Sequence, residues 1–200
     1  MTRPLQAFFI PYLLVFMVGM VTVYLQDHGD FVLWLNERHN PVLDVFFKWA
    51  TYLGDGVFLA VVSVLLILFK RRYGFVLALI GISQAIVSFF LKRVVFGRVP
   101  RPKKFFDDLS QLNFVEGVDV NGFYSFPSGH TMTGFSIAFF LVFVFRNSMV
   151  SVLLLVGAIL VGLSRVYLLQ HFLIDILAGS LVGLFISYLG YRLSRNYLEP

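Results

Sequence analysis

Residues 150–191 read VSVLLLVGAILVGLSRVYLLQHFLIDILAGSLVGLFISYLGY, and they indicate the class of fold. Two apolar runs, residues 150–168 and 172–191, are joined by a short polar turn. A helix of about 20 apolar residues crosses the roughly 30 Å of hydrocarbon in a bilayer. Backbone polar groups inside lipid must bond within their own segment, so helices are the expected structure. The stretch therefore predicts two membrane-spanning helices.

The composition of the whole chain supports a membrane protein. Of the 200 residues, 58% are hydrophobic and 14% are charged, and the mean hydropathy is +0.84. A soluble domain carries about 25% charged residues, so this chain lacks the polar side chains to cover a water-facing surface. The net charge of +5 is assigned to short loops that meet anionic lipid head groups, and nucleic acid is not an expected partner. The absence of cysteine excludes disulfides and thiolate metal sites.

The apolar runs predict an all-α bundle of six transmembrane helices. They cover residues 8–25, 57–69, 75–96, 131–145, 150–168 and 172–191. The second and fourth runs are short for a full crossing. Between the first two runs, apolar residues at helical spacing and both tryptophans predict one or two interfacial helices. No repeat or linker divides the chain, so residues 1–200 are expected to form one domain.

Basic residues in the loops predict the orientation of the bundle. Arg3, Lys70, Arg146 and Arg192 all fall at one membrane face of a six-helix model, and positive loops mark the cytoplasmic side. Both termini are then cytoplasmic, and the connection over residues 92–126 faces outward. That connection is also basic, which weakens a simple count of charges. We expect an integral protein of the bacterial inner membrane with its active site on the outer, periplasmic face.

Three clusters of polar residues stand beside the apolar runs, where ionisable groups usually have a function. They lie at residues 92–102, 125–131 and 164–175, and the six-helix model places all three at the same face. His171 and Asp175 are four residues apart and share one helix face. A carboxylate on one imidazole nitrogen leaves the other nitrogen nucleophilic. His130 supplies a second imidazole for proton transfer.

The remaining residues of these clusters are suited to binding phosphate. Lys92, Arg101 and Arg165 offer fixed positive charge, and the guanidinium fork matches phosphate oxygens. Ser128 and Gly129 open a predicted helix, where a hydroxyl and bare backbone amides form an anion site. A metal site is a poorer interpretation because acidic residues are scarce. The inventory predicts phosphoryl transfer with neither metal nor cofactor.

The motifs resemble the type 2 phosphatidic acid phosphatase family, which shares its core with vanadium haloperoxidases and bacterial acid phosphatases. Pro-Ser-Gly-His matches at residues 127–130, and Ser-Arg, five residues, His, three residues, Asp matches at residues 164–175. The resemblance covers about residues 30–192. In the family's first motif, a lysine precedes Arg-Pro by six residues, whereas eight separate Lys92 from Arg101 here. We favour Lys92 and Arg101 for these roles, with Arg93 or Arg98 as the alternative.

The resemblance implies a membrane lipid phosphatase that works through a phosphohistidine. His171 attacks phosphorus, Asp175 orients it, and His130 protonates the leaving group and then activates water. The expected substrate is undecaprenyl pyrophosphate, phosphatidylglycerol phosphate, phosphatidate or a phosphate of lipid A. Two alternatives stay open at this stage: a phosphotransferase that uses the same histidine, and a non-catalytic lipid carrier on the same scaffold. Neither the substrate nor the oligomeric state can be chosen from the sequence.

Overall fold

Six long helices coincide with the six predicted apolar runs. The computed structural model describes residues 2–198, and over that range it holds helices and a single isolated β-bridge, Pro100–Phe123, with no strand. The long helices are α1 (Arg3–Leu25), α4 (Gly56–Phe69), α5 (Arg71–Phe90), α7 (Gly129–Phe145), α8 (Ser148–Tyr167) and α9 (Leu173–Leu193). The all-helical class is thereby confirmed.

Fewer helices meet the length and hydropathy of a full membrane crossing than the six long helices. Four helical segments are long and apolar enough to span a bilayer: Arg3–Leu25, Arg71–Val95, Ser148–Tyr167 and Leu173–Leu193. The pair Pro41–Gly54 and Gly56–Phe69 qualifies as a fifth only if it is one span bent by 57°. Helix α7 has 17 residues and is short for a crossing. The structure supports an apolar bundle with four or five candidate spans, and the count of six stays a prediction.

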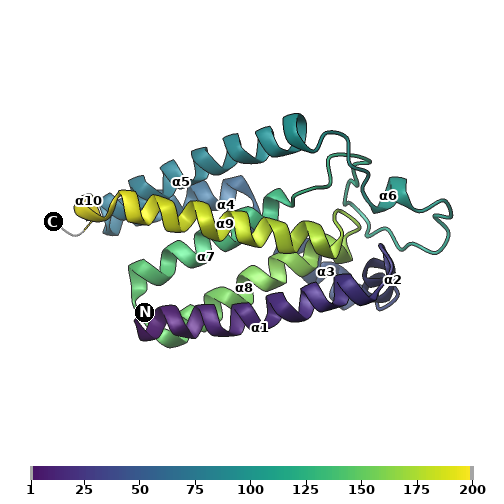
Figure 1. Ribbon diagram of the computed structural model, residues 1–200, viewed down its shortest axis with the longest axis horizontal. Coiled ribbons are helices and arrows are strands. Elements are labelled where there is room, and N and C mark those ends of the chain that lie inside the picture. Colours follow the sequence, from purple (N-terminus) through teal and green to yellow (C-terminus); the bar gives the residue numbers. More distant parts are fainter. Residues whose placement is uncertain (1, 199–200) are drawn as a thin grey trace.

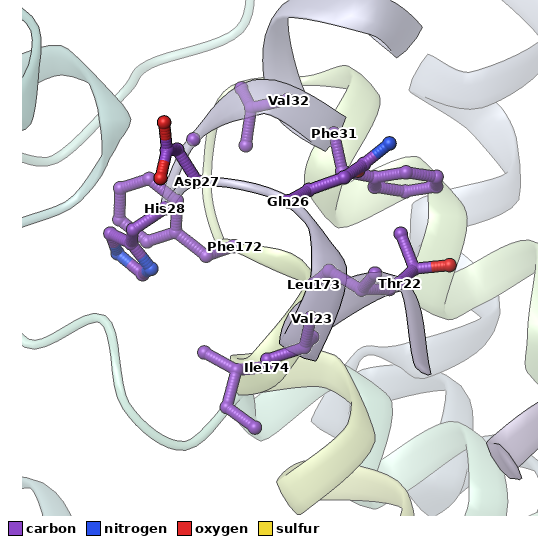
Figure 2. A pocket seen from close by; sticks show the side chains of 11 residues that line it. Thr22, Val23, Gln26, Asp27, His28, Phe31, Val32, Phe172, Leu173 and Ile174 are labelled. Atoms are coloured by element: carbon purple, nitrogen blue, oxygen red, sulfur yellow. The ribbon is translucent and has the colours of Figure 1, made fainter. Parts of the chain in front are cut away.

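Four short helical segments gather at one end of the bundle (Figure 1). They are α2 (Asp30–Asn36), α3 (Pro41–Ala50), the 3-10 turn η1 (Thr51–Gly54) and α6 (Pro102–Phe105). The side chain of Asn40 accepts hydrogen bonds from the first backbone amides of α3, and Pro41 follows it, a favourable start for a helix. A small hollow of about 70 Å³ lies between α1, α2 and the start of α9, where the ring of His28 lies against that of Phe172 (Figure 2).

The first residues of α1 and the last residues of α9 lie at the opposite end of the bundle (Figure 1). Helix α10 (Arg195–Leu198) sits beside the start of α5, where the guanidinium of Arg72 donates to the carbonyl of Tyr197 at 3.2 Å. The basic residues used to orient the chain are at the helix ends on this side. The end with the short helices is therefore separated from these cations by the length of the apolar bundle.

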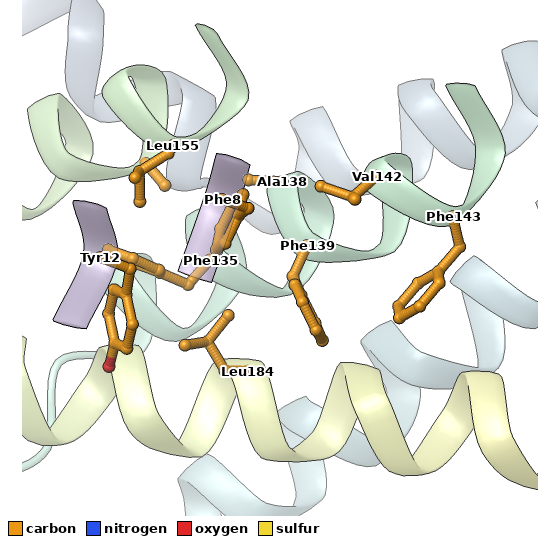
Figure 3. Packing of buried hydrophobic residues seen from close by; sticks show 10 residues of the cluster. Phe8, Tyr12, Phe135, Ala138, Phe139, Val142, Phe143, Leu155 and Leu184 are labelled. Carbon is orange, nitrogen blue, oxygen red and sulfur yellow. The ribbon is translucent and has the colours of Figure 1, made fainter. Parts of the chain in front are cut away.

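Helix α7 forms the centre of the bundle. Every residue from 131 to 144 is buried, because α1, α5, α8 and α9 surround it (Figures 1 and 3). A helix apolar on all sides is expected in such a position. Its aromatic side chains meet those of α1: Phe8 packs on Phe139, and Tyr12 on Phe135 (Figure 3). The enclosure covers the sides of α7, while Phe145 at its C-terminal end is exposed.

Small residues let α9 approach α7 closely. A Cβ added at Gly183 would lie 2.4 Å from the backbone oxygen of Met132, so no side chain fits there. The hydroxyl of Ser136 donates to the carbonyl of Gly183 at 2.9 Å across the same contact. Small side chains and interhelical hydrogen bonds are typical of helix packing in membranes. This contact holds the middle of α9 against the first two turns of α7.

Candidate active site

The three predicted polar clusters meet at the end of the bundle that holds the short helices. A cavity of about 430 Å³ opens there. Its lining includes six of the eight predicted site residues, namely Lys92, Arg101, Gly129, His130, Arg165 and His171. Ser128 and Asp175 do not line the cavity and stand directly behind residues that do. The small hollow of Figure 2 contains none of the eight.

His171 and Asp175 form a buried pair at the start of α9. Nδ1 of His171 lies 3.2 Å from Oδ2 of Asp175, and the two residues are 1% and 2% exposed. The same oxygen accepts the backbone amide of Phe172 at 2.9 Å and the hydroxyl of Ser125 at 2.5 Å. An ionised Asp175 keeps the imidazole proton on Nδ1 and leaves the lone pair on Nε2. The arrangement therefore holds the ring in place and leaves Nε2 as the ring nitrogen that is not bonded to Asp175.

The surroundings of His171 favour the neutral imidazole. Burial lowers the pKa of His171 well below its usual value, and the nearby cations Arg101, Lys92 and Arg165 lower it further. Desolvation and like charge both disfavour the imidazolium. The neutral imidazole that these surroundings favour is the form that a nucleophilic role would use.

His130 faces the same cavity and has an acidic partner that the sequence did not assign to it. Its Nε2 lies 3.7 Å from Oδ2 of Asp55, with both side chains about one third exposed. The other oxygen of Asp55 accepts the amide of Val57 at 2.8 Å and caps α4, which holds the carboxylate in place. Gly54 permits this approach, since a Cβ there would lie 2.5 Å from the carbonyl of His130. Asp55 lies in a Leu-Gly-Asp run at residues 53–55, outside the three polar clusters of the sequence.

Each of the three predicted cations is held by a neutral group, so its charge is left for a ligand. Arg101 donates to the carbonyl of Phe123 at 3.0 Å and to the amide oxygen of Gln170 at 2.5 Å. Burial lowers the pKa of Arg101, and the charge of Asp175 opposes that shift. Gln170 was not assigned a role from the sequence, yet it ties Arg101 to the turn between α8 and α9.

Arg165 and Lys92 join Arg101 in lining the cavity with positive charge. Arg165 is 8% exposed and donates to Oγ1 of Thr51 at 2.7 Å, while its Nε has no hydrogen-bond partner. Lys92 lies on a π-helical turn, η2 (Leu91–Val95), that extends α5, and it donates to the carbonyl of Tyr124 at 3.0 Å. A buried guanidinium with an unused N–H suits a phosphate oxygen.

The geometry favours Lys92 and Arg101 over the alternative pair. Arg93 stacks on the ring of Tyr124 at 3.9 Å, and Arg98 stacks on Phe123 at 4.4 Å. Neither of these guanidiniums lines the cavity. Lys92 and Arg101 both line the cavity, although eight residues separate them where the family's first motif has six.

Ser128 and Gly129 begin α7 in different ways. Ser128 is fully buried, and its hydroxyl oxygen accepts from Oγ1 of Thr131 at 2.9 Å. Its backbone amide donates to the carbonyl of Asp175 at 3.0 Å. Gly129 lines the cavity and offers bare backbone at a helix N-terminus. In this structure Ser128 caps α7 and joins it to α9, while Gly129 faces the space where an anion would bind.

Comparison with known proteins places the chain among proteins of one family. The family model of the PAP2 superfamily, which describes its sequences, matches residues 69–198. A lipid A 4'-phosphatase of Porphyromonas gingivalis is 30% identical over 84% of this chain and 73% of its own length. The crystal structure of Aquifex aeolicus LpxE superposes with a TM-score of 0.72 at 28% identity, covering 82% of this chain and 94% of that one. The crystal structure of a phosphatidylglycerolphosphate phosphatase of Bacillus subtilis superposes with a TM-score of 0.66 at 25% identity, and the match covers 98% of both chains.

Proposed function

The chain belongs to the PAP2 superfamily, and on that premise we propose that it removes phosphate from a membrane lipid through a covalent intermediate on His171. One observation carries the proposal. The buried pair of His171 and Asp175, a second histidine and three cations converge on one cavity at the end of an apolar bundle. The relatives are named as phosphatases of lipid A and of phosphatidylglycerolphosphate. The protein is a membrane lipid phosphatase, and a lipid phosphomonoester or diphosphate is its substrate class.

The first chemical step transfers the phosphoryl group to the protein. Nε2 of His171 attacks phosphorus, so that an N–P bond forms while the P–O bond to the lipid breaks. His130 gives its proton to the departing oxygen. Arg101 and Arg165 stabilise the charge on the equatorial oxygens, a contribution of about 10²–10³ in rate for each well-placed donor. The lipid product leaves as an alcohol, or as a lipid phosphate when the substrate is a diphosphate.

The second step returns the protein to its starting state. Neutral His130 takes a proton from water, and the water oxygen attacks phosphorus. The N–P bond breaks, inorganic phosphate leaves, and His171 regains its lone pair. Asp55 orients the ring of His130 and stabilises its charged form, as Asp175 orients His171. The two imidazoles thus have separate carboxylates and separate tasks.

The proposed placement in the membrane follows from the two ends of the bundle. All six long helices cross the bilayer, with the enclosed α7 crossing among the others. The chain ends and the basic turns lie in the cytoplasm, and the cavity faces the outer side of the bacterial inner membrane. Arg98, Lys103 and Lys104 then lie at the level of outer head groups. Fusion of a reporter enzyme to each loop tests this placement, and an active cytoplasmic reporter in residues 107–120 would overturn it.

The function is tested by phosphate release from the purified protein in detergent. The panel contains undecaprenyl pyrophosphate, phosphatidylglycerol phosphate, phosphatidate and lipid A, with EDTA present throughout. We expect release that survives EDTA, is abolished in His171→Ala and is unchanged in His39→Ala, a control at an exposed histidine outside the cavity. With a radiolabelled lipid, an acid-labile phosphoprotein should appear in wild type and not in His171→Ala.

The same assay separates the two alternative functions. Label that moves to a second lipid in place of water identifies a phosphotransferase. Lipid binding without any release, equal in wild type and His171→Ala, identifies a carrier. Activity that disappears with EDTA and returns with a divalent metal would refute the proposed mechanism.

A further inference from the structure

A fourth cation, Lys48, lines the active-site cavity and is not used by the two steps of phosphoryl transfer. It lies near the end of α3 and is half-buried. Its Nζ donates to the backbone carbonyl of Glu116 at 2.8 Å. Within residues 2–198, which the structure describes, Lys48 forms no ion pair with a carboxylate. Its charge is therefore left for a ligand, because its one partner is neutral.

The position of Lys48 on α3 places it beside Arg165. Thr51, three residues further along, accepts from a guanidinium nitrogen of Arg165 at 2.7 Å. The backbone of Thr51 continues the helical conformation of α3. Residues three apart on a helix are neighbours on its surface, with Cβ atoms about 5–6 Å apart. Lys48 and Arg165 thus lie along the same part of the cavity.

The loop that follows α6 packs around the ammonium of Lys48. Gly117 has a φ of +70°, which favours glycine, and a Cβ there would lie 2.7 Å from Nζ of Lys48. Further along the loop, the carbonyl of Asp119 accepts from Gln170 at 2.8 Å, and Gln170 in turn holds Arg101. Figure 1 shows α3 and this loop at the same end of the bundle. The loop therefore holds Lys48 at the edge of the cavity without neutralising it.

The cavity is larger and more positive than one phosphoryl group requires. Its lining holds four cations, Lys48, Lys92, Arg101 and Arg165, and among the described lining residues Asp119 is the only acid. A pocket of about 300–1,000 Å³ encloses a drug-sized ligand, which is much larger than a phosphate. A lysine ammonium binds phosphate as a point charge. The cavity thus has both the space and the charge for a second anionic group of the same substrate.

We propose that Lys48 binds a second phosphate of the substrate, next to the phosphate that His171 attacks. The proposal rests on the proposed function and narrows its substrate class to lipids that carry two phosphates in the head group. The two phosphates are either joined as a diphosphate or attached at separate positions, and both arrangements present the same charge to the ammonium. A lipid with one phosphate leaves Lys48 on the carbonyl of Glu116 alone.

The test uses two pairs of lipids whose members differ by one phosphate. The first pair is diacylglycerol pyrophosphate and phosphatidate with the same acyl chains. The second is lipid A with two phosphates and lipid A that keeps only the phosphate that the enzyme removes. In Lys48→Met, which removes the charge, kcat/KM should fall about 3- to 10-fold more for the two-phosphate member than for its partner, the range of one net hydrogen bond. The pair that responds identifies joined or separate phosphates.

Two further variants separate the charge of Lys48 from its contact with the loop. Lys48→Gln removes the charge and retains an N–H donor for the carbonyl of Glu116, so it should lose the preference as Lys48→Met does. Lys70→Met is the matched control. Lys70 also donates to a backbone carbonyl, that of Val144 at 3.0 Å, but it lies between α4 and α5, outside the cavity. This control should keep the wild-type ratio in both pairs.

Equal losses for the two members of both pairs in Lys48→Met would overturn the proposal. A wild-type preference in Lys48→Gln would also overturn it, since the lysine would then act only by holding the loop. If Lys48→Met does not fold, Lys48→Gln decides the question by the same ratios. Each of these results leaves the phosphatase function intact, whereas no release by wild type from any lipid would remove the function first.

Discussion

Replacing Ser125 by alanine tests whether the support of Asp175 matters for catalysis. The hydroxyl of Ser125 donates to Oδ2 of Asp175 at 2.5 Å, and both side chains are buried. A hydrogen bond to a charged group contributes about 1.5–3 kcal/mol net. At 1.36 kcal/mol for each factor of ten, its full loss from the transition state would slow the reaction about 10- to 150-fold.

The expected effect of Ser125→Ala lies at the lower end of that range. Asp175 still accepts from the backbone amide of Phe172 and from His171, so the carboxylate stays in place and the imidazole keeps its tautomer. We expect kcat for phosphate release to fall about tenfold. The rate of phosphoprotein formation in a single turnover should fall equally, because the serine acts through His171.

The matched control is Ser110→Ala. Ser110 also donates to an aspartate, Asp108, at 2.7 Å, but on an exposed loop. This control should leave kcat unchanged. The reasoning is refuted if Ser125→Ala, with an unaltered thermal unfolding midpoint, retains kcat within twofold of wild type. It is also refuted if Ser110→Ala loses as much activity.

Three further predictions address other parts of the structure. Asp55→Asn should lower kcat about fivefold, the equivalent of about 1 kcal/mol for a partly exposed ion pair with His130; full activity in single-turnover hydrolysis would argue against this partnership. Burial first, and then the neighbouring cations, lower the pKa of His171, so the acid limb of kcat/KM that reports its protonation should lie below about pH 6.5. By linkage, the stability that comes from burying the neutral ring is complete above that pH and is lost as the pH falls toward the folded-state pKa. A pH series of rates and of unfolding midpoints checks both expectations, and an acid limb above about pH 6.5 would contradict them. Gly183→Ala should destabilise the protein by about 1–3 kcal/mol, since the new Cβ meets the backbone of α7 at 2.4 Å. The control Gly157→Ala, where nothing lies within 4 Å, should be neutral or slightly stabilising. Equal unfolding midpoints for the two variants would contradict the expectation.

The sequence alone was sufficient for properties that depend on neighbouring residues. Apolar runs predict helices in a membrane because the backbone has no other partner there, and all six runs are helical in the structure. His171 and Asp175 are four residues apart, and their contact is local: α9 begins at Leu173, and the carboxylate of Asp175 in its first turn reaches back to Nδ1 of His171. The order and spacing of the motifs indicated the family for the same reason, since each motif is continuous along the chain.

Tertiary packing decided which distant polar groups meet. Asp55 reaches His130, Ser125 reaches Asp175, and Gln170 reaches Arg101 across long stretches of sequence. Each of these side chains has many possible partners, and a pattern in the sequence does not choose among them. The choice between Lys92 and Arg93 was open for this reason, because the direction of each side chain depends on the π-helical turn.

Packing also explains the features that length and spacing alone described poorly. Ser128 had the right neighbours for an anion site, yet its hydroxyl accepts from Thr131 as the cap of α7, and its carbonyl lies against Gly179 of α9. The run at residues 131–145 is short for a crossing, and in the structure it is the helix α7 that the other helices enclose. Local chemistry thus determined the helices and the motifs, whereas the close approach of helices at small residues determined which side chains face the cavity.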